Sequence, residues 1–160
     1  MHDPLPSGPR DLIGAAREAA THAHAPYSRF AVGAAVLLTD GSIVAGANFE
    51  NASYGLSLCA ETVAIATANA QGRLGDVVAV SVIGGMIDAS GRAAGDAPVR
   101  PCGRCRQVLN EAAQIGGRDL PIYCGGAQGD RVEEYRLTDL LPDAFGPADL
   151  GHAPHARRTD

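Results

Sequence analysis

The first third of the chain alternates between helical and strand-like spacing of its apolar residues. From Arg10 to Pro26 the apolar side chains recur every three or four positions, which predicts a helix closed by Pro26. Residues 32–39 and 43–48 are mostly apolar, which predicts two strands, with Asp40-Gly41 as a two-residue hairpin turn between them.

The middle of the chain continues the same alternation. Residues 59–71 are rich in alanine and are followed by Gly72, which predicts a helix with a glycine at its C-terminal cap. Residues 77–83 predict a buried strand, residues 86–100 a loop, and residues 102–114 another helix.

The last third predicts two more strands, 120–124 and 132–137, joined by a glycine-rich turn at 125–130. This turn lacks a lysine and does not lead into a helix, so it does not have the pattern of a phosphate-binding loop. Thr138 is expected to cap a short helical turn at 139–141.

The order of these elements predicts an α/β fold with a mixed five-stranded sheet flanked by helices in an α-β-α arrangement. A length of 160 residues suits a single domain spanning 1–160. The polar ends, about 1–9 and 151–160, are expected to be mobile tails.

Composition and charge limit the partners of the chain. No apolar run approaches the roughly 20 residues that a membrane span needs, and residues 1–10 do not have a secretory signal pattern, so we expect a cytoplasmic protein. The net charge is -5, and the densest basic group, Arg100, Arg104 and Arg106, lies inside a cysteine motif. A small neutral substrate fits this balance better than a nucleic acid.

Three of the four cysteines lie in two short motifs, Cys59-Ala60-Glu61 and Pro101-Cys102-Gly103-Arg104-Cys105. Without a secretory signal, a disulfide framework is not expected. Cys124 follows an apolar run and is expected to be a small buried side chain in a strand.

The spacing of these cysteines indicates a metal site. Cys102 and Cys105, three positions apart at a helix start, project from one face. Cys59 begins a second predicted helix, and helix N-termini favour the thiolate that a metal requires. Three cysteine ligands leave one position of a zinc tetrahedron open, as in catalytic sites.

The histidines are weaker candidates for the fourth ligand. His22 and His24 end the first predicted helix, where they are either ligands or solvent-exposed polar residues. His2, His152 and His155 fall in or beside the expected tails and are not expected to bind the metal.

Glu61 is the candidate catalytic residue. It follows Cys59 by two positions, where a carboxylate can move a proton between a zinc-bound water and a substrate. The alternative is a glutamate that only stabilises the first helical turn. Its pairing with the second cysteine motif favours catalysis.

These motifs resemble those of the small homotetrameric cytidine deaminases, which are zinc enzymes. The resemblance runs from about residue 25 to 150 and includes the segments 26–35, 48–51, 106–108 and 140–146. Related deaminases have histidine at the position of Cys59. The cysteine here makes the chain resemble the short tetrameric branch of the family.

The resemblance implies roles for further residues. Asn48 and Glu50 would hold the ribose 3′-hydroxyl, Phe30 would lie beside the base, and Ala60 would contact the substrate. Ala52, Tyr54 and Phe145 would reach the site of a neighbouring subunit. Phe30 and Phe145 are alternatively plain core residues, and Asn48 a turn residue that ends a strand.

The implied reaction is the hydrolysis of cytidine and 2′-deoxycytidine to uridine and 2′-deoxyuridine, with release of ammonia, in pyrimidine salvage. A zinc-bound water would attack C4 while Glu61 shuttles the protons.

One position departs from the family pattern. Thr62 stands where many relatives have an arginine that contacts the ligand sulfurs. Three thiolates and one Zn²⁺ have a net charge of -1, which would make the zinc a weaker acid. Arg104 or the helix N-termini are hypothesised to offset this charge.

Three alternatives remain open at this point. Residues 101–109 are also similar to the motif of blasticidin S deaminase, although residues 48–51 favour cytidine. A zinc-stabilised interaction module would not need Glu61 or an open metal position. A deaminase acting on nucleic acid would be expected to have a basic surface.

Overall fold

The computed structural model describes residues 8–152, so residues 1–7 and 153–160, most of the two predicted tails, lie outside the described part. Pro9, assigned to the first tail, instead begins a helix. The elements are α1 (Pro9–Ala20), β1 (Phe30–Leu38), β2 (Ile43–Ala47), η1 (Tyr54–Leu56), α2 (Ala60–Ala70), η2 (Leu74–Asp76), β3 (Val77–Ile87), β4 (Ala93–Ala94), α3 (Gly103–Gly116), β5 (Pro121–Gly126), β6 (Val132–Arg136), α4 (Leu137–Leu140) and η3 (Pro147–Leu150).

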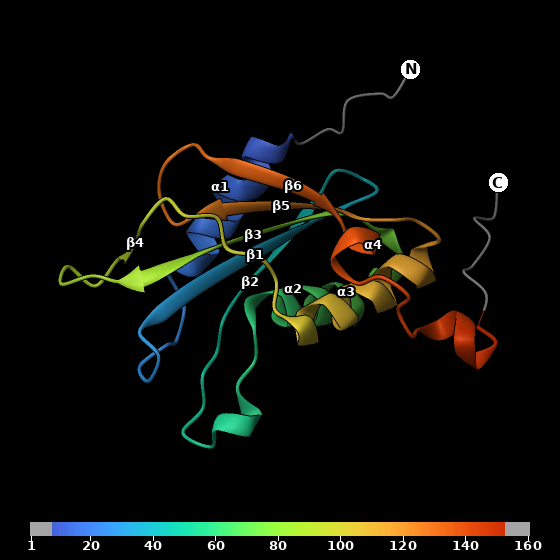
Figure 1. The fold of residues 1–160 in the computed structure, drawn as a ribbon, viewed down its shortest axis with the longest axis horizontal. Helices are drawn as coiled ribbons and strands as arrows, with labels where there is room; N and C mark the ends of the chain where they lie inside the picture. The colour runs from blue at the N-terminus through green and yellow to red at the C-terminus, as the bar shows by residue number, and fades with distance from the viewer. Residues whose placement is uncertain (1–7, 153–160) are drawn as a thin grey trace.

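A mixed sheet forms the centre of the molecule, with the strand order β2-β1-β3-β5-β6 (Figure 1). Neighbouring strands are antiparallel except β3 and β5, which are parallel and are connected through α3. A parallel pair needs such a crossover connection. The α/β class and the five long strands are therefore confirmed.

The sixth strand, β4, pairs with the end of β3 inside the segment 86–100 that was predicted to be a loop. β3 itself continues to Ile87, past the predicted end at residue 83. The prediction was wrong here because the glycine-rich sequence favours a loop, whereas β4 is stabilised by pairing with β3 across a turn.

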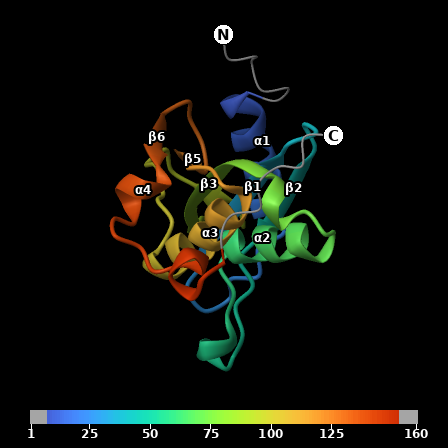
Figure 2. The same ribbon diagram turned by 90° about the vertical axis from the view of Figure 1, so that its right-hand side faces the viewer.

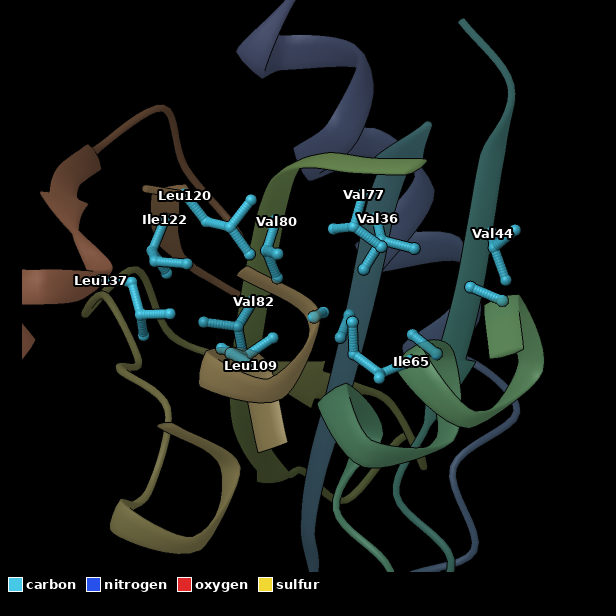
Figure 3. Packing of buried hydrophobic residues seen from close by; sticks show 14 of the residues in the cluster. Val36, Val44, Ile65, Val77, Val80, Val82, Leu109, Leu120, Ile122 and Leu137 are labelled. Carbon is cyan, nitrogen blue, oxygen red and sulfur yellow. The ribbon is translucent and has the colours of Figure 1, made fainter. Parts of the chain in front are cut away.

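Helix α1 covers one face of the sheet, and α2 and α3 cover the other (Figures 1 and 2). The side chains of β3 alternate between these faces. Val80 and Val82 pack on the side of α2 and α3, together with Ile65 and Leu109 of these helices (Figure 3). Ala79 and Ile83 pack against α1. Burial on both faces explains why the central strands are almost continuously apolar.

Gly46 in β2 allows α2 to approach the sheet closely. A Cβ atom at this position would lie 2.7 Å from the carbonyl oxygen of Ala60 and 2.7 Å from the amide nitrogen of Ala64. The first turn of α2 therefore packs on the backbone of β2, and this contact fixes the position of Cys59 and Glu61 at the start of the helix.

The β1–β2 turn has three residues, Thr39 to Gly41, rather than the predicted two. Leu38 and Ser42 form the last backbone pair, and Gly41 adopts a positive φ of 86°. This is the type I turn with a left-handed third residue that such loops favour. The Asp40-Gly41 signal was correct, but the loop length was wrong.

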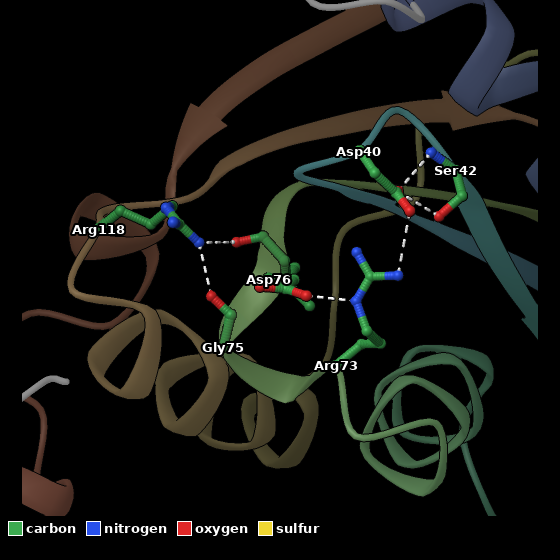
Figure 4. A network of polar contacts seen from close by, with 7 residues as sticks. Asp40, Ser42, Arg73, Gly75, Asp76 and Arg118 are labelled. Atoms are coloured by element: carbon green, nitrogen blue, oxygen red, sulfur yellow. Dashed lines mark hydrogen bonds and ion pairs between the residues drawn. The ribbon is translucent and has the colours of Figure 1, made fainter. Parts of the chain in front are cut away.

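Side-chain hydrogen bonds anchor this turn to the segment that precedes β3 (Figure 4). The Asp40 carboxylate accepts hydrogen bonds from Ser42 and from Arg73, and these lower its pKa, the Ser42 hydroxyl most. Arg73 also pairs with Asp76, directly before β3. Arg118 donates to the carbonyl oxygen of Gly75 at 2.8 Å.

The remaining predictions differ in detail. α1 ends at Ala20 rather than near Pro26. Gly125 and Gly126 are the last residues of β5 rather than part of the turn. Thr138 lies inside α4 rather than at its N-terminal cap. Its hydroxyl donates to the Asp119 carboxylate. Within residues 8–152, no helix has the length and apolar character required to cross a membrane.

Replacing Gly46 by alanine should destabilise the protein. The new Cβ meets backbone atoms of α2, so the helix has to move, and overpacking of this kind costs about 1–3 kcal/mol. Urea unfolding of the metal-free protein measures the change. Gly14→Ala is the control, because Gly14 lies in α1 with open space around it and should lose no stability. Equal unfolding midpoints for the two variants would contradict the proposed close contact.

Candidate metal centre and adjoining cavity

The N-termini of α2 and α3 meet at one place on the sheet. Cys59 is the N-terminal cap of α2, and Cys102 is the N-terminal cap of α3. Cys105 lies in the first turn of α3 and is fully buried. The three sulfur atoms all lie within 4.8 Å of one another, so the fold brings the three predicted ligands together.

The spacing of the sulfurs fits a tetrahedral zinc ion. Zn–S distances of about 2.3 Å would place two sulfurs about 3.8 Å apart. The Sγ atoms of Cys59 and Cys102 are 3.9 Å apart. Thiolates are also the soft ligands that zinc accepts. The donor set therefore fits zinc in distance and in chemistry.

Within residues 8–152, the metal-ligand cluster consists of the three cysteines alone. The His22 side chain lies 4.0 Å from Glu18 on the exposed surface, and the His24 ring lies against the Phe49 ring, with 5.9 Å between the ring centroids. His2 and His155 lie outside the described residues. The side chains that were considered as a fourth ligand thus serve other contacts where they are described.

The thiols differ in how readily they ionise. The pKa of Cys59 is lowered to about 6, first by a hydrogen bond from the Cys105 thiol, with smaller contributions from Cys102 and from the charge of Arg104. The same pairing with Cys59, together with burial, raises the pKa of Cys105. Without metal, Cys105 therefore keeps its proton, and metal binding has to release it.

Glu61 lies beside the sulfur cluster and is only 4% exposed. Its Oε2 atom lies 3.5 Å from the Sγ atom of Cys105. Burial is the main cause that raises the pKa of Glu61, and the charge on Cys59 raises it further. A carboxyl group whose pKa is raised toward neutrality can both accept and donate a proton, as a general acid–base catalyst must.

Thr62 supplies a contact that the sequence analysis missed. Its Oγ1 atom is 3.6 Å from the Sγ atom of Cys105. Arg104, the hypothesised compensator, is exposed and makes no hydrogen bond with another described residue, so it acts on the sulfurs only through its charge. The sequence marked position 62 as unusual, but only the structure shows where its hydroxyl lies.

A cavity of about 260 Å³ adjoins the sulfurs. It is lined by residues of β1, of the segment 48–61 and of the segment that leads into α3: Val32, Asn48, Glu50, Ser57, Leu58, Cys59, Ala60, Glu61, Val99, Arg100 and Cys102. A larger hollow lies beside α1, but Glu61 and two of the candidate metal ligands, Cys59 and Cys102, line the smaller cavity, so chemistry identifies the smaller cavity as the candidate site.

Among the predicted substrate-binding residues, Asn48, Glu50 and Ala60 line this cavity. Phe30, Ala52, Tyr54 and Phe145 are not among its lining residues. The sequence analysis missed five lining residues, Val32, Ser57, Leu58, Val99 and Arg100. For the last four, proximity to the cysteines in sequence was the available signal, but it does not tell which side chains face the cavity.

Asn48 and Glu50 are held by the backbone around them. The Asn48 amide donates to the carbonyl oxygen of Phe30 and accepts from the N–H of Val32, each at 2.9 Å. Glu50 accepts from the N–H groups of Tyr27 and Ser28 at 3.1 Å. Hydrogen bonds, first from the Ser28 side chain, lower the pKa of Glu50, so the cavity has an ionised carboxylate at a fixed position.

Tyr54 and Phe145 have exposed rings. Tyr54 lies on the segment 50–58, which projects from the sheet (teal in Figure 1), and is 73% exposed. Phe145 is 60% exposed. Its carbonyl oxygen accepts hydrogen bonds from Gln107 and Asn110 of α3 at 2.8 and 3.2 Å. α3 therefore fixes the main chain at Phe145 while the ring is left to the surface.

Comparison with known proteins gives one consistent result. Residues 8–116 match the model of the cytidine and deoxycytidylate deaminase zinc-binding region. The chain is 46% identical to a cytidine deaminase of Halalkalibacterium halodurans over 87% of its length and 95% of the relative's. It is 45% identical to that of Mycobacterium tuberculosis, covering 92% and 94%. The crystal structure of cytidine deaminase from Burkholderia pseudomallei superposes with a TM-score of 0.72 at 44% identity, covering 85% and 98%.

The pKa of Cys59 predicts its reactivity in the metal-free protein. Alkylation of Cys59 should rise with pH through a midpoint near 6, because the thiolate is the reactive form. In Arg104→Ala this midpoint should move to higher pH, since a positive charge that favours the thiolate is lost. Mass spectrometry of the peptide that contains Cys59, from chelator-treated and reduced protein, measures the rate. An unchanged midpoint in Arg104→Ala would exclude Arg104 as a compensating charge.

Proposed function

The chain belongs to the cytidine and deoxycytidylate deaminase family, zinc-dependent hydrolytic enzymes, and we propose that it converts cytidine and 2′-deoxycytidine to uridine and 2′-deoxyuridine with release of ammonia, as a step of pyrimidine salvage. One observation supports this proposal above the others. The buried Glu61 carboxyl lies 3.5 Å from the Cys105 sulfur of the three-cysteine cluster, and it lines the same cavity as the other two cysteines, Cys59 and Cys102.

Cys59, Cys102 and Cys105 would hold the zinc, which supplies a Lewis acid that activates water for attack on C4. Glu61 takes one proton from the attacking water and delivers it to N3 of the pyrimidine. It then takes the second proton from the new C4 hydroxyl and delivers it to the 4-amino group, which leaves as ammonia while C4=O forms. Because burial raises its pKa, Glu61 can hold each proton between its uptake and its delivery.

The cavity provides contacts for a nucleoside. Val32, Leu58 and Val99 offer apolar surface for the pyrimidine ring. Asn48 and Glu50 would bind the ribose 3′-hydroxyl, and the ionised Glu50 carboxylate is a strong acceptor for it. Both residues are half-buried, and polar partners at a cavity discriminate against a ligand that lacks the hydroxyl group.

We propose further that four copies assemble and complete one another's sites. Ala52, Tyr54 and Phe145 do not line the cavity of their own chain, and Tyr54 and Phe145 are largely exposed. Phe30, on β1 next to the cavity residue Val32, would lie beside the base. Sedimentation equilibrium of the full chain tests the assembly: a mass of four chains supports it, and a monomer contradicts it.

Blasticidin S, a cytosine nucleoside with a different sugar, is the alternative substrate suggested by residues 101–109. The carboxylate of Glu50 at the cavity favours a sugar with a free hydroxyl group. The values of kcat/KM for cytidine, 2′-deoxycytidine and blasticidin S decide between them. A preference for blasticidin S would overturn the assignment of the substrate while leaving the reaction type intact.

Replacing Glu61 by glutamine should abolish turnover without loss of zinc. The amide cannot carry the proton, and general acid–base catalysis contributes about 10²- to 10⁴-fold in rate. Ammonia release from cytidine, zinc content and circular dichroism are measured together. A variant that keeps its zinc and its fold but still releases ammonia at the wild-type rate would rule out Glu61 as the proton carrier, and a wild-type protein that releases none would favour a zinc-stabilised interaction module.

A further inference from the structure

Thr62 lies on α2 next to Glu61, and its hydroxyl points at a metal ligand of the other helix. The Oγ1 atom is 3.6 Å from the Sγ atom of Cys105 on α3. We propose that Thr62 is a positioning residue whose hydroxyl donates a hydrogen bond to the Cys105 thiolate and thereby tunes the zinc. This inference rests on the proposed function, because it requires that Cys105 binds zinc.

The direction of this hydrogen bond follows from the metal site. A hydroxyl can donate or accept, and a thiol can do the same. Once Cys105 binds a metal ion its sulfur has lost its proton and can only accept, so Thr62 has to donate. Cys105 is 0% exposed, so solvent water does not compete for the sulfur.

The hydrogen bond has a chemical consequence because the ligand set carries excess negative charge. Three thiolates exceed the two positive charges of Zn²⁺, which lowers the acidity of the metal. A donor on one sulfur draws electron density away from the metal. Partners of metal ligands tune both orientation and metal properties in this way.

The other groups near the sulfurs cannot replace Thr62. Glu61 also contacts Cys105, but the reaction transfers its proton to the substrate, so it is not a permanent donor to the thiolate. The backbone N–H of Cys105 donates to a different sulfur, that of Cys102. The charge of Arg104 favours the thiolate of Cys59 from an exposed position, where solvent screens it.

Thr62 does not line the cavity, which separates its role from substrate binding. Removing its hydroxyl should lower the acidity of the bound metal and therefore kcat, while KM for cytidine should stay close to the wild-type value. A residue that only supported the fold would instead affect stability without changing the electronic state of the ligand sulfur.

The test compares Thr62→Val, which keeps the shape and loses the donor, with Thr62→Ser, which keeps the donor. Thr67→Val is the matched control, because Thr67 is a half-buried threonine on the same helix whose hydroxyl donates to Val63. For each protein, kcat and KM for cytidine are measured, zinc affinity is determined by competition with a chelator, and the sulfur-to-metal charge-transfer absorption is recorded after substitution with Co²⁺.

Thr62→Val should lose about 10- to 100-fold in kcat or zinc affinity, the size typical of such partners of metal ligands. Its charge-transfer band should move to lower energy, because the sulfur is richer in electrons without the donor. Thr62→Ser and Thr67→Val should match the wild type in all three measurements. Should Thr62→Val fold poorly, Thr62→Ala carries the same expectation for the band.

Two outcomes overturn the inference. One is a charge-transfer band and kcat in Thr62→Val equal to the wild type. The other is a Thr62→Ser variant as impaired as Thr62→Val, which would assign the effect to packing of the methyl group. The cobalt band needs no turnover, so a wild-type protein that binds metal but releases no ammonia refutes the proposed function alone. A wild-type protein that binds neither Zn²⁺ nor Co²⁺ refutes both.

Discussion

The convergence of two helix N-termini is the constraint on which the site depends. α2 lies directly on β2 because Gly46 has no side chain, and α3 connects the parallel strands β3 and β5 on the same face of the sheet. Cys59 caps one helix and Cys102 the other, so the contact between the helices is also the contact between the sulfurs. The metal ligands are thus positioned by the packing of the core rather than by a flexible loop.

The same packing makes the site dependent on its metal. Burial raises the pKa of Glu61, and pairing with Cys59 together with burial raises that of Cys105. Without metal, the low-dielectric interior favours their neutral forms. A divalent cation held by the three cysteines would replace the proton on Cys105 and reverse this preference. The Thr62 hydroxyl, which can change from acceptor to donor as the sulfur loses its proton, suits both states.

Patterns of apolar residues predicted α1, α3 and the five long strands, because α1 and α3 each have one apolar side and the central strands are buried on both faces. Alanine content and Gly72 predicted α2. Such patterns failed where hydrogen-bond geometry decides the structure, as in the three-residue turn at Gly41, the short β4 strand and the position of Thr138. In the site, cysteine spacing was sufficient to predict that the three sulfur atoms come together. The contact between Thr62 and Cys105 joins residues 43 positions apart, and no local pattern reports it.

The exposed aromatic residues Phe145 and Tyr54 lie on segments that are connected to the candidate metal site. Gln107 and Asn110 bind the carbonyl oxygen of Phe145, and both lie on α3 within two turns of Cys105. A displacement of α3 would therefore move a zinc ligand and the presented Phe145 ring together. On the other side, the segment that carries Tyr54 leads directly into Cys59. The segment that carries Tyr54 and the helix that holds the main chain of Phe145 thus each bear a cysteine, so the proposed assembly and metal binding would stabilise the same arrangement of helices.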